Sequence, residues 1–92
     1  MFLEIVTPEA SIFQGDVDSV TVPGVVGEFQ ILNNHAPIVS LLQAGNVRIS
    51  GNLEIEEAYQ DKFSKGDNNS KVLKINSGTI EMNDNKIIIL VD

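Results

Sequence analysis

The sequence predicts an all-β fold, a flattened β-sandwich or barrel of about eight to ten short strands, in one domain of residues 1–92. Short apolar runs alternate with turn residues at close spacing, which is typical of sandwiches and barrels. Only Tyr59 and the four Phe residues are aromatic, so the core depends on Ile, Val and Leu, which favour strands. A chain of 92 residues suits one domain, and no repeat or internal linker divides it.

The first third of the chain predicts four strands, over residues 2–6, 11–15, 17–22 and 28–31. Thr7-Pro8 ends the first strand, and Gly15 marks a bulge or bend in the second. From Val20 the third strand alternates with the period of a half-buried strand. Pro23-Gly24 and Gly27 are predicted turns that separate the third strand from the fourth.

Five more strands are predicted over residues 38–42, 46–50, 72–75, 79–82 and 87–91. Pro37 biases the residue before it toward extended geometry, which fits the start of the first of these. Asn76-Ser77-Gly78 and Asn83-Asp84-Asn85 are turns. The run Ile87–Val91 is apolar on both faces, which predicts a central strand covered on both sides.

Residues 51–71 form the polar part of the chain, and their conformation stays open at this level. Leu53 and Ile55 alternate like a strand. Ala58, Tyr59 and Phe63 suit either a strand or a helical turn. The run from Gly66 to Ser70 is predicted to be a surface loop because it gathers Gly, Asp, Asn and Ser.

The formal net charge of −7 excludes several classes of partner. Residues 1–50 carry one cation, Arg48, against the acids Glu4, Glu9, Asp16, Asp18 and Glu28. Such a surface repels phosphate backbones and anionic headgroups, which argues against nucleic-acid binding and against direct binding to a membrane surface, and we expect no direct membrane insertion. No apolar run approaches the length of a membrane span, and Met1 leads into a strand without a basic signal region. With no cysteine, the chain fits a reducing compartment, and we expect a cytosolic protein.

His35 is the only histidine, and the sequence provides it with no catalytic companions. A catalytic histidine needs a nucleophile and an orienting carboxylate, and neither Ser40 nor Ser50 lies in a nucleophile-elbow motif. A metal site needs three or four suitably spaced ligands, and no other His or Cys is present. We therefore predict no catalytic residue, no metal site and no cofactor. Two interpretations of His35 stay open: a brace for its turn or a contact with a partner.

Other polar groups are better explained as solvated turns and faces. Asp16 and Asp18, like the Asn-rich turns at 67–70 and 83–85, lack the complete oxygen set of a calcium loop. Glu54, Glu56 and Glu57 resemble the paired acids of a glycosidase, but aromatic sugar platforms are missing. No glycine run has the form of a phosphate-binding loop.

Two turn-rich regions remain, around Pro23–Gly27 and Asn33–Pro37, and Val25, Val26, Phe29 and Ile31 are many apolar side chains for such a part of the chain. Val25 and Val26 stand between glycine turns, where we expect them to be exposed. Exposed apolar tips on a small acidic domain indicate a protein partner.

The stretch Gly-Glu-Phe-Gln-Ile-Leu-Asn-Asn-His-Ala-Pro-Ile at 27–38 is similar to a known signature, Gly-Glu-x-Gly-Ile-x-Pro-x-His-Ala-Pro-Leu. Phe13-Gln14-Gly15 and the run from Leu42 to Ile49 match two further elements, and residues 75–82 and 87–92 match a final hairpin and last strand. Over residues 1–50 and 71–92 the chain thus resembles the epsilon subunit of F-type ATP synthase, called delta in mitochondria.

The chain departs from that pattern in three places. Gln30 replaces the usual glycine and Asn33 the usual proline, so we expect a local difference in the loop. Residues 51–70 do not align. The family usually continues into a C-terminal helical hairpin associated with braking ATP hydrolysis, whereas this sequence ends at Asp92. We expect a short form, either natural or truncated.

The resemblance implies a non-catalytic rotor subunit of the central stalk, which joins the gamma subunit to the c-ring and couples proton flow to ATP synthesis. It implies indirect contact with the catalytic alpha/beta hexamer and a peripheral location at the cytoplasmic face of the bacterial inner membrane. Residues carried over as facing gamma are His35 and Ser40. Those carried over as facing the c-ring are Pro23, Gly24, Val25, Val26, Gly27, Glu28, Phe29 and Gln30.

Two alternatives come from other functional classes. One is a stand-alone β-sandwich ligand-binding module such as a carbohydrate binder, which the shortage of aromatic residues argues against. The other is a small hydrolase, which the missing triad argues against.

Overall fold

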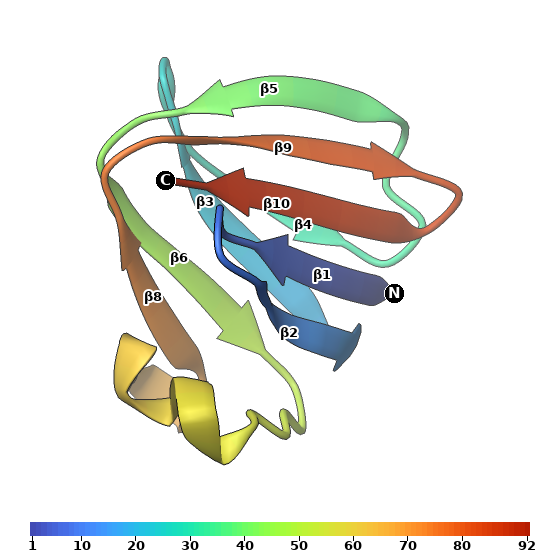
Figure 1. Cartoon of the computed structure of the whole chain (residues 1–92). Coiled ribbons are helices and arrows are strands. Elements are labelled where there is room, and N and C mark those ends of the chain that lie inside the picture. Colours follow the sequence, from blue (N-terminus) through green and yellow to red (C-terminus); the bar gives the residue numbers. More distant parts are fainter.

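The computed structural model describes residues 1–92 and contains ten strands and two short 3-10 helices (Figure 1). The first half of the chain holds β1 (Phe2–Val6), β2 (Ser11–Asp16), β3 (Ser19–Gly24), β4 (Gly27–Leu32), β5 (Ile38–Leu42) and β6 (Gly45–Ser50). The second half holds η1 (Glu57–Lys62), β7 (Phe63–Lys65), η2 (Asp67–Asn69), β8 (Lys71–Ile75), β9 (Gly78–Asn83) and β10 (Lys86–Val91). The all-β prediction is confirmed, with each of the nine predicted strands present.

All ten strands belong to one continuous sheet, in the order β2-β1-β10-β9-β5-β3-β6-β8-β7, with β4 paired to β3. The only parallel pair is β1 with β10, so the first and last strands lie side by side. The sheet curls strongly, and Figure 1 shows β5, β9, β10, β1 and β2 facing β3, β4, β6 and β8. The fold is therefore a sandwich made from a single bent sheet.

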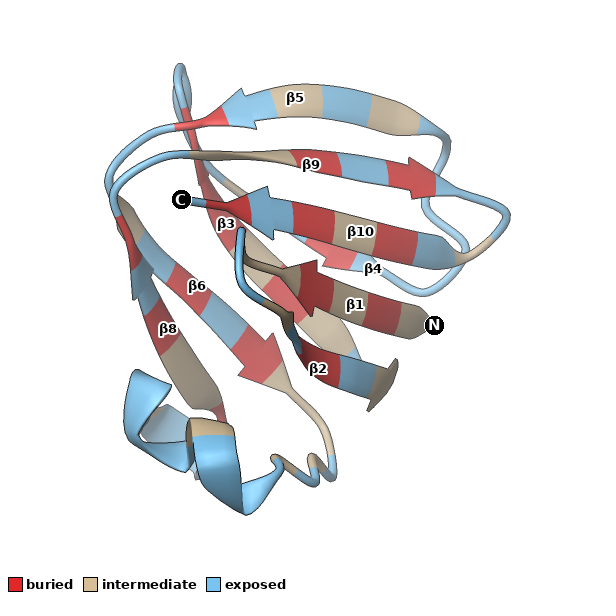
Figure 2. Cartoon of the chain, in the orientation of Figure 1, coloured by how far each residue is buried: buried red, intermediate tan, exposed pale blue.

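The core lies between these two halves and follows the strand period. In β1 the alternate residues Leu3 and Ile5 are buried, and in β6 the same holds for Val47 and Ile49. Figure 2 shows this alternation as red bands along the strands. Eighteen apolar residues form one buried cluster, and Phe13 is its only aromatic member. The prediction of an aliphatic core is confirmed.

The irregularity in β2 does not lie at Gly15, as the sequence suggested. The register with β1 shifts between Ile5↔Phe13 and Val6↔Ser11, which leaves Ile12 as the extra residue. A bulge lets two consecutive side chains turn to the same side, and both Ile12 and Phe13 are buried. The bulge thus adds an apolar side chain to a thin core.

The prediction of a turn at Pro23-Gly24 is wrong, because both residues belong to β3. The turn follows at Val25 and Val26. A proline is tolerated in a strand where its missing N–H has no ladder partner. On the edge of β3 opposite β4, Ser19–Thr21 pair with β6 and Gly24 pairs with β5. Pro23 lies between these two paired stretches. Gly45 leaves room for the proline ring, since a Cβ there would lie 2.8 Å from the Pro23 Cβ.

The polar segment 51–70, whose conformation the sequence left open, contains two 3-10 helices and one short strand. Ala58 and Tyr59 lie in η1, and Phe63 begins the short β7 beside β8. Leu53 and Ile55, which alternate like a strand, belong to none. Their side chains, together with those of Tyr59 and Phe63, are half-buried against the core. The segment therefore covers the open end of the sandwich.

Candidate docking surfaces

The turn between β3 and β4 forms an exposed apolar tip. Val25 and Val26 are the two loop residues between the paired Gly24 and Gly27, and their exposed fractions are 53% and 100%. Gly24 has no room for a side chain, because a Cβ would come within 2.8 Å of both the Phe29 ring and the Gly27 oxygen. The Phe29 ring therefore packs on the backbone at the tip and stiffens the hairpin.

The eight residues that the resemblance assigned to the c-ring are brought together in this hairpin, but not all reach the surface. Pro23 and Gly24 are buried and Phe29 is half-buried. The other five are exposed, namely Val25, Val26, Gly27, Glu28 and Gln30. We call these five residues the hairpin tip.

An ion pair supports the hairpin from its side. Arg48 on β6 donates to the Glu28 carboxylate over 3.1 Å, across β3, and both side chains are about half exposed. A pair of this exposure contributes little to stability. Its effect is to hold the only cation of residues 1–50 next to the hairpin tip.

The loop with His35 is held by backbone and asparagine contacts. The His35 N–H donates to the Leu32 carbonyl (3.1 Å), and its Nδ1 lies 2.8 Å from the Ala36 carbonyl oxygen. Because a carbonyl oxygen only accepts, Nδ1 carries the hydrogen of this bond. The ring is exposed. His35 thus braces its turn, as one of its two interpretations predicted, while its surface remains free for a partner.

Asparagines connect this loop to the β9–β10 turn. The Asn34 N–H donates to the Asn85 Oδ1 (2.8 Å), and the Asn85 Nδ2 donates to the Asn33 Oδ1 (2.9 Å). Asn34 and Asn85 both adopt positive φ, which asparagine tolerates better than most residues. Asn33, which replaces the proline of the signature, therefore provides an acceptor that proline lacks.

Ser40 lies on β5 and is half-buried, with its Oγ donating to the Leu41 carbonyl over 3.2 Å. No hydrogen bond joins it to His35, the other residue assigned to gamma. The neighbours of Ser40 on the strand, Val39 and Leu41, point to the opposite side and are 78% and 63% exposed. These two side chains belong to an exposed face of the sheet that was not predicted from the sequence.

That face is the outer side of β5, β9 and β10. The pairing places Leu41, Thr79 and Leu90 in one row, and Val39, Glu81 and Ile88 in the next. Leu90 is 49% exposed and Ile88 half-buried, so nothing in the chain covers this side of β10. The prediction that β10 is covered on both faces is therefore wrong for the isolated domain. We call these six residues the outer face.

The doubly apolar run Ile87–Val91 was the signal in the sequence for this surface. Such a run predicts burial on both faces, but it does not distinguish a covering layer of the same chain from a partner protein. The structure shows the inner set, Ile87, Ile89 and Val91, in the core and the remainder at the surface.

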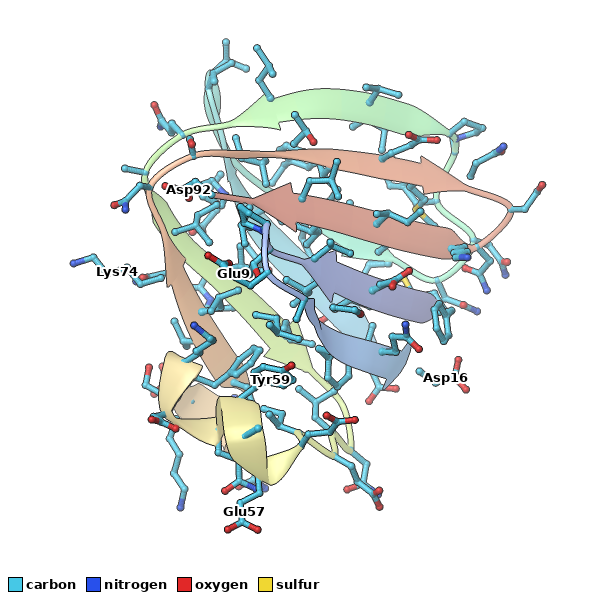
Figure 3. The ribbon with its side chains drawn as sticks, viewed as in Figure 1. Glu9, Asp16, Glu57, Tyr59, Lys74 and Asp92 are labelled. Carbon is cyan, nitrogen blue, oxygen red and sulfur yellow. The ribbon has the colours of Figure 1, made fainter.

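Asp92 is the one acid with a clearly shifted pKa. Its carboxylate accepts hydrogen bonds from the backbone N–H of Ser77 (3.2 Å) and of Asn76 (3.4 Å), and the bond from Ser77 is the main cause that lowers the pKa. Figure 3 shows Asp92 at the end of β10, beside the turn that precedes β9. The contact secures the last residue of the domain to the β8–β9 turn.

No group of three or more His, Asp or Glu side chains is placed to hold a metal ion. The two 3-10 helices are far too short to cross a bilayer, and the fold has no longer helix. The hairpin tip and the outer face both expose large apolar side chains. Fold and surface together define a small all-β domain with two exposed surfaces that carry apolar side chains.

Comparison with known proteins assigns the domain to one family. Residues 1–92 match the family described as ATP synthase, Delta/Epsilon chain, beta-sandwich domain. The chain belongs to this family, as its resemblance predicted.

Its relatives include ATP synthase epsilon chains of bacteria. That of Campylobacter concisus is 42% identical over 92 residues, which are all of this chain and 60% of the relative. That of Chlorobium limicola is 37% identical over 90 residues, covering 98% of this chain and 86% of the relative. The chain thus spans about three fifths of the first of these relatives and most of the second.

Solved structures share the fold at low identity. A chain of the central stalk and c-ring assembly of the Tetrahymena thermophila mitochondrial ATP synthase matches with a TM-score of 0.73 and 19% identity, over 99% of this chain and 62% of that one. A chain of the Euglena gracilis mitochondrial enzyme matches with a TM-score of 0.72 and 20% identity, over 97% and 48%. The single curled sheet is therefore a fold that central-stalk assemblies contain.

Proposed function

We propose that this chain is a non-catalytic accessory subunit of a proton-translocating ATP synthase, placed in the rotor between the gamma subunit and the c-ring. The observation that carries the proposal is the family match over the whole chain. Relatives named ATP synthase epsilon chain and a fold shared with central-stalk assemblies support it. In this role the domain couples proton flow to ATP synthesis without performing chemistry, at the cytoplasmic face of the bacterial inner membrane.

The hairpin tip is the part that we assign to the c-ring. It presents Val25 and Val26 at the end of a hairpin that the Phe29 ring stiffens. Glu28 adjoins them and is partly neutralised by Arg48. An exposed apolar pair with one acid at its side suits a polar loop of a partner protein rather than lipid.

The outer face, together with the loop of His35, is the part that we assign to gamma. Val39, Leu41 and Leu90 provide apolar side chains for the centre of an interface. His35 lies in the loop that precedes β5 and adds an exposed polar group to the rim of this interface. Ser40 contributes less than the sequence suggested, because its side chain is half-buried.

The physical contribution of the domain is stiffness. One sheet with ten strands closes around a single core, and the first and last strands pair directly. A core packed at the density of organic crystals resists deformation. Torque can then pass between the two surfaces with little loss to bending of the domain.

A binding measurement with purified gamma subunit tests this assignment. Leu41→Asp places a charge in the outer face, and we expect it to weaken binding by about tenfold or more. Ala58→Asp adds the same charge at an exposed position of η1 and serves as the control. Equal affinity of both variants for gamma would place the interface elsewhere.

A further inference from the structure

A third surface lies at the edge of the sheet, away from the hairpin tip and the outer face. β2 is the end of the strand order and pairs on one side only, with β1 (Figure 1). Residues of an antiparallel strand direct their N–H and C=O alternately toward the partner and away from it. The Val17 N–H donates to the Met1 carbonyl, so the backbone groups of Gly15 and Phe13, two and four residues earlier, also point to β1. Those of Gln14 and Asp16 therefore point to the open side.

A groove runs along this open edge. Its volume is about 510 Å³, and its walls are Ser11–Gln14 of β2 and the facing residues Glu54–Glu56. Volumes of this order hold ligands in many proteins. Ile12, Phe13 and Ile55 give the groove an apolar floor.

The opposite wall also offers unpaired backbone. Leu53 and Glu54 belong to no strand, and their backbone groups form no hydrogen bond within the chain. On that wall Glu54 thus has free backbone, whereas the carbonyls of Ile55 and Glu56 accept from Gln60 and Tyr59. An extended segment laid along β2 can bond to its free backbone, as an added strand does at other sheet edges.

The charges around the groove select the chemistry of that segment. Glu54 and Glu56 are exposed on one wall, and no Lys or Arg lines the groove. Asp16 projects from the far end of β2 (Figure 3). The Glu4 carboxylate, which accepts from the Ser11 Oγ (3.0 Å) and the Gln14 Nε2 (2.9 Å), adds a further negative charge beside the strand.

We propose that the groove between β2 and residues 54–56 binds a basic polypeptide segment in extended conformation, which joins the sheet through the free backbone of Gln14 and Asp16. Alternate side chains of the segment enter the apolar floor, and Lys or Arg side chains between them meet Glu54 and Glu56. The segment needs about five or six residues to follow β2 at the usual rise per residue. This inference goes beyond the proposed function and does not depend on it.

The test uses a capped, fluorescently labelled hexapeptide of alternating lysine and valine, titrated into the full chain at low salt. Binding should slow the hydrogen exchange of the Gln14 and Asp16 amides, as observed by NMR. The same peptide N-methylated at alternate residues keeps its charge but loses the backbone donors, and we expect its binding to fall by about tenfold or more. A peptide of alternating glutamate and valine should not bind.

Variants of the chain separate the two contributions. Glu54→Gln combined with Glu56→Gln should weaken binding by about tenfold, whereas Asp67→Asn at an exposed position of η2 should leave it unchanged. Equal binding of the N-methylated peptide would overturn the proposal, since attraction would then be charge alone. Protection at β4 or β7 in place of β2 would also overturn it, as would self-association of the chain through β2.

Discussion

Gly78 shows how closely single residues are fitted in this domain. It begins β9 opposite Val91, and a Cβ at this position would lie 2.5 Å from the Leu90 carbonyl oxygen. Such a distance to backbone cannot be relieved by a side-chain rotation. The glycine of the Asn-Ser-Gly turn is therefore required by close approach of two strands.

We expect Gly78→Ala to lower the free energy of unfolding by roughly 1–3 kcal/mol, because the strands must separate to admit the methyl group. Urea denaturation followed by circular dichroism measures the change as a lower midpoint at constant slope. Ser77→Ala, at the exposed neighbouring position, is the control and should behave like the unchanged protein.

Asp92 predicts a pH dependence at the acid end. Its pKa in the folded domain lies below the ordinary value of 3.8, chiefly because the Ser77 N–H donates to the carboxylate. A lowered pKa means that the folded state binds the proton more weakly, so the stabilisation is present above that ordinary value and is lost as the pH falls through the folded pKa. Melting temperatures measured at about pH 6 and about pH 3 should differ less in Asp92→Asn than in the unchanged chain. An identical difference in both proteins would show that the Asp92 carboxylate does not contribute to the pH dependence of stability.

At the scale of elements, β10 has one side in the core, which stabilises the fold, and one side at the surface. Ile89 is fully buried and Leu90, the next residue, is 49% exposed. The two side chains are of equal size and point to opposite faces of the same strand. Their contributions to stability should therefore differ sharply.

We predict that Ile89→Ala lowers the free energy of unfolding by about 2–4 kcal/mol, because it leaves a cavity in the core. Leu90→Ala should cost less than about 1 kcal/mol, because the side chain is already half in water. Denaturant titration of both variants provides the comparison. A comparable loss in the two would mean that the outer side of β10 is covered after all.

The positions of the strands could be predicted because alternation and turn residues agree along most of the chain. The bulge at Ile12 could not, since only pairing with β1 shows which residue is extra. The turn predicted at Pro23 is wrong for a similar reason, because the place of this proline inside β3 depends on where β6 stops pairing. η1 was undetermined because its half-buried residues, such as Tyr59, gain their order from contact with the core.

The candidate site was partly predictable. The hairpin tip follows from two valines between glycine turns, a local pattern. The outer face does not, because Val39 and Leu90 are distant in sequence and meet only through β9. The groove beside β2 is harder still to foresee, since it depends on which strand lies at the end of the sheet.

At the scale of the whole molecule, the domain measures about 32 × 25 × 24 Å, and its two candidate docking surfaces lie on separate elements. The hairpin tip extends from β3 and β4, whereas the outer face spans β5, β9 and β10. The sheet connects them without a hinge, because β3 pairs directly with β5 at Gly24. In the proposed rotor role, we expect a load applied at one surface to reach the other through this paired backbone.

ATP-driven proton pumping in membrane vesicles is the measurement that tests the rotor assignment most directly. Vesicles are reconstituted with the ATP synthase containing this chain, the Val26→Asp variant or the Ala58→Asp control, and both pumping and ATP hydrolysis are recorded. The account predicts less proton pumping per ATP hydrolysed for Val26→Asp, because the charge disturbs the hairpin tip while its full exposure leaves the fold intact. Pumping equal to that of the unchanged chain and the control would contradict it.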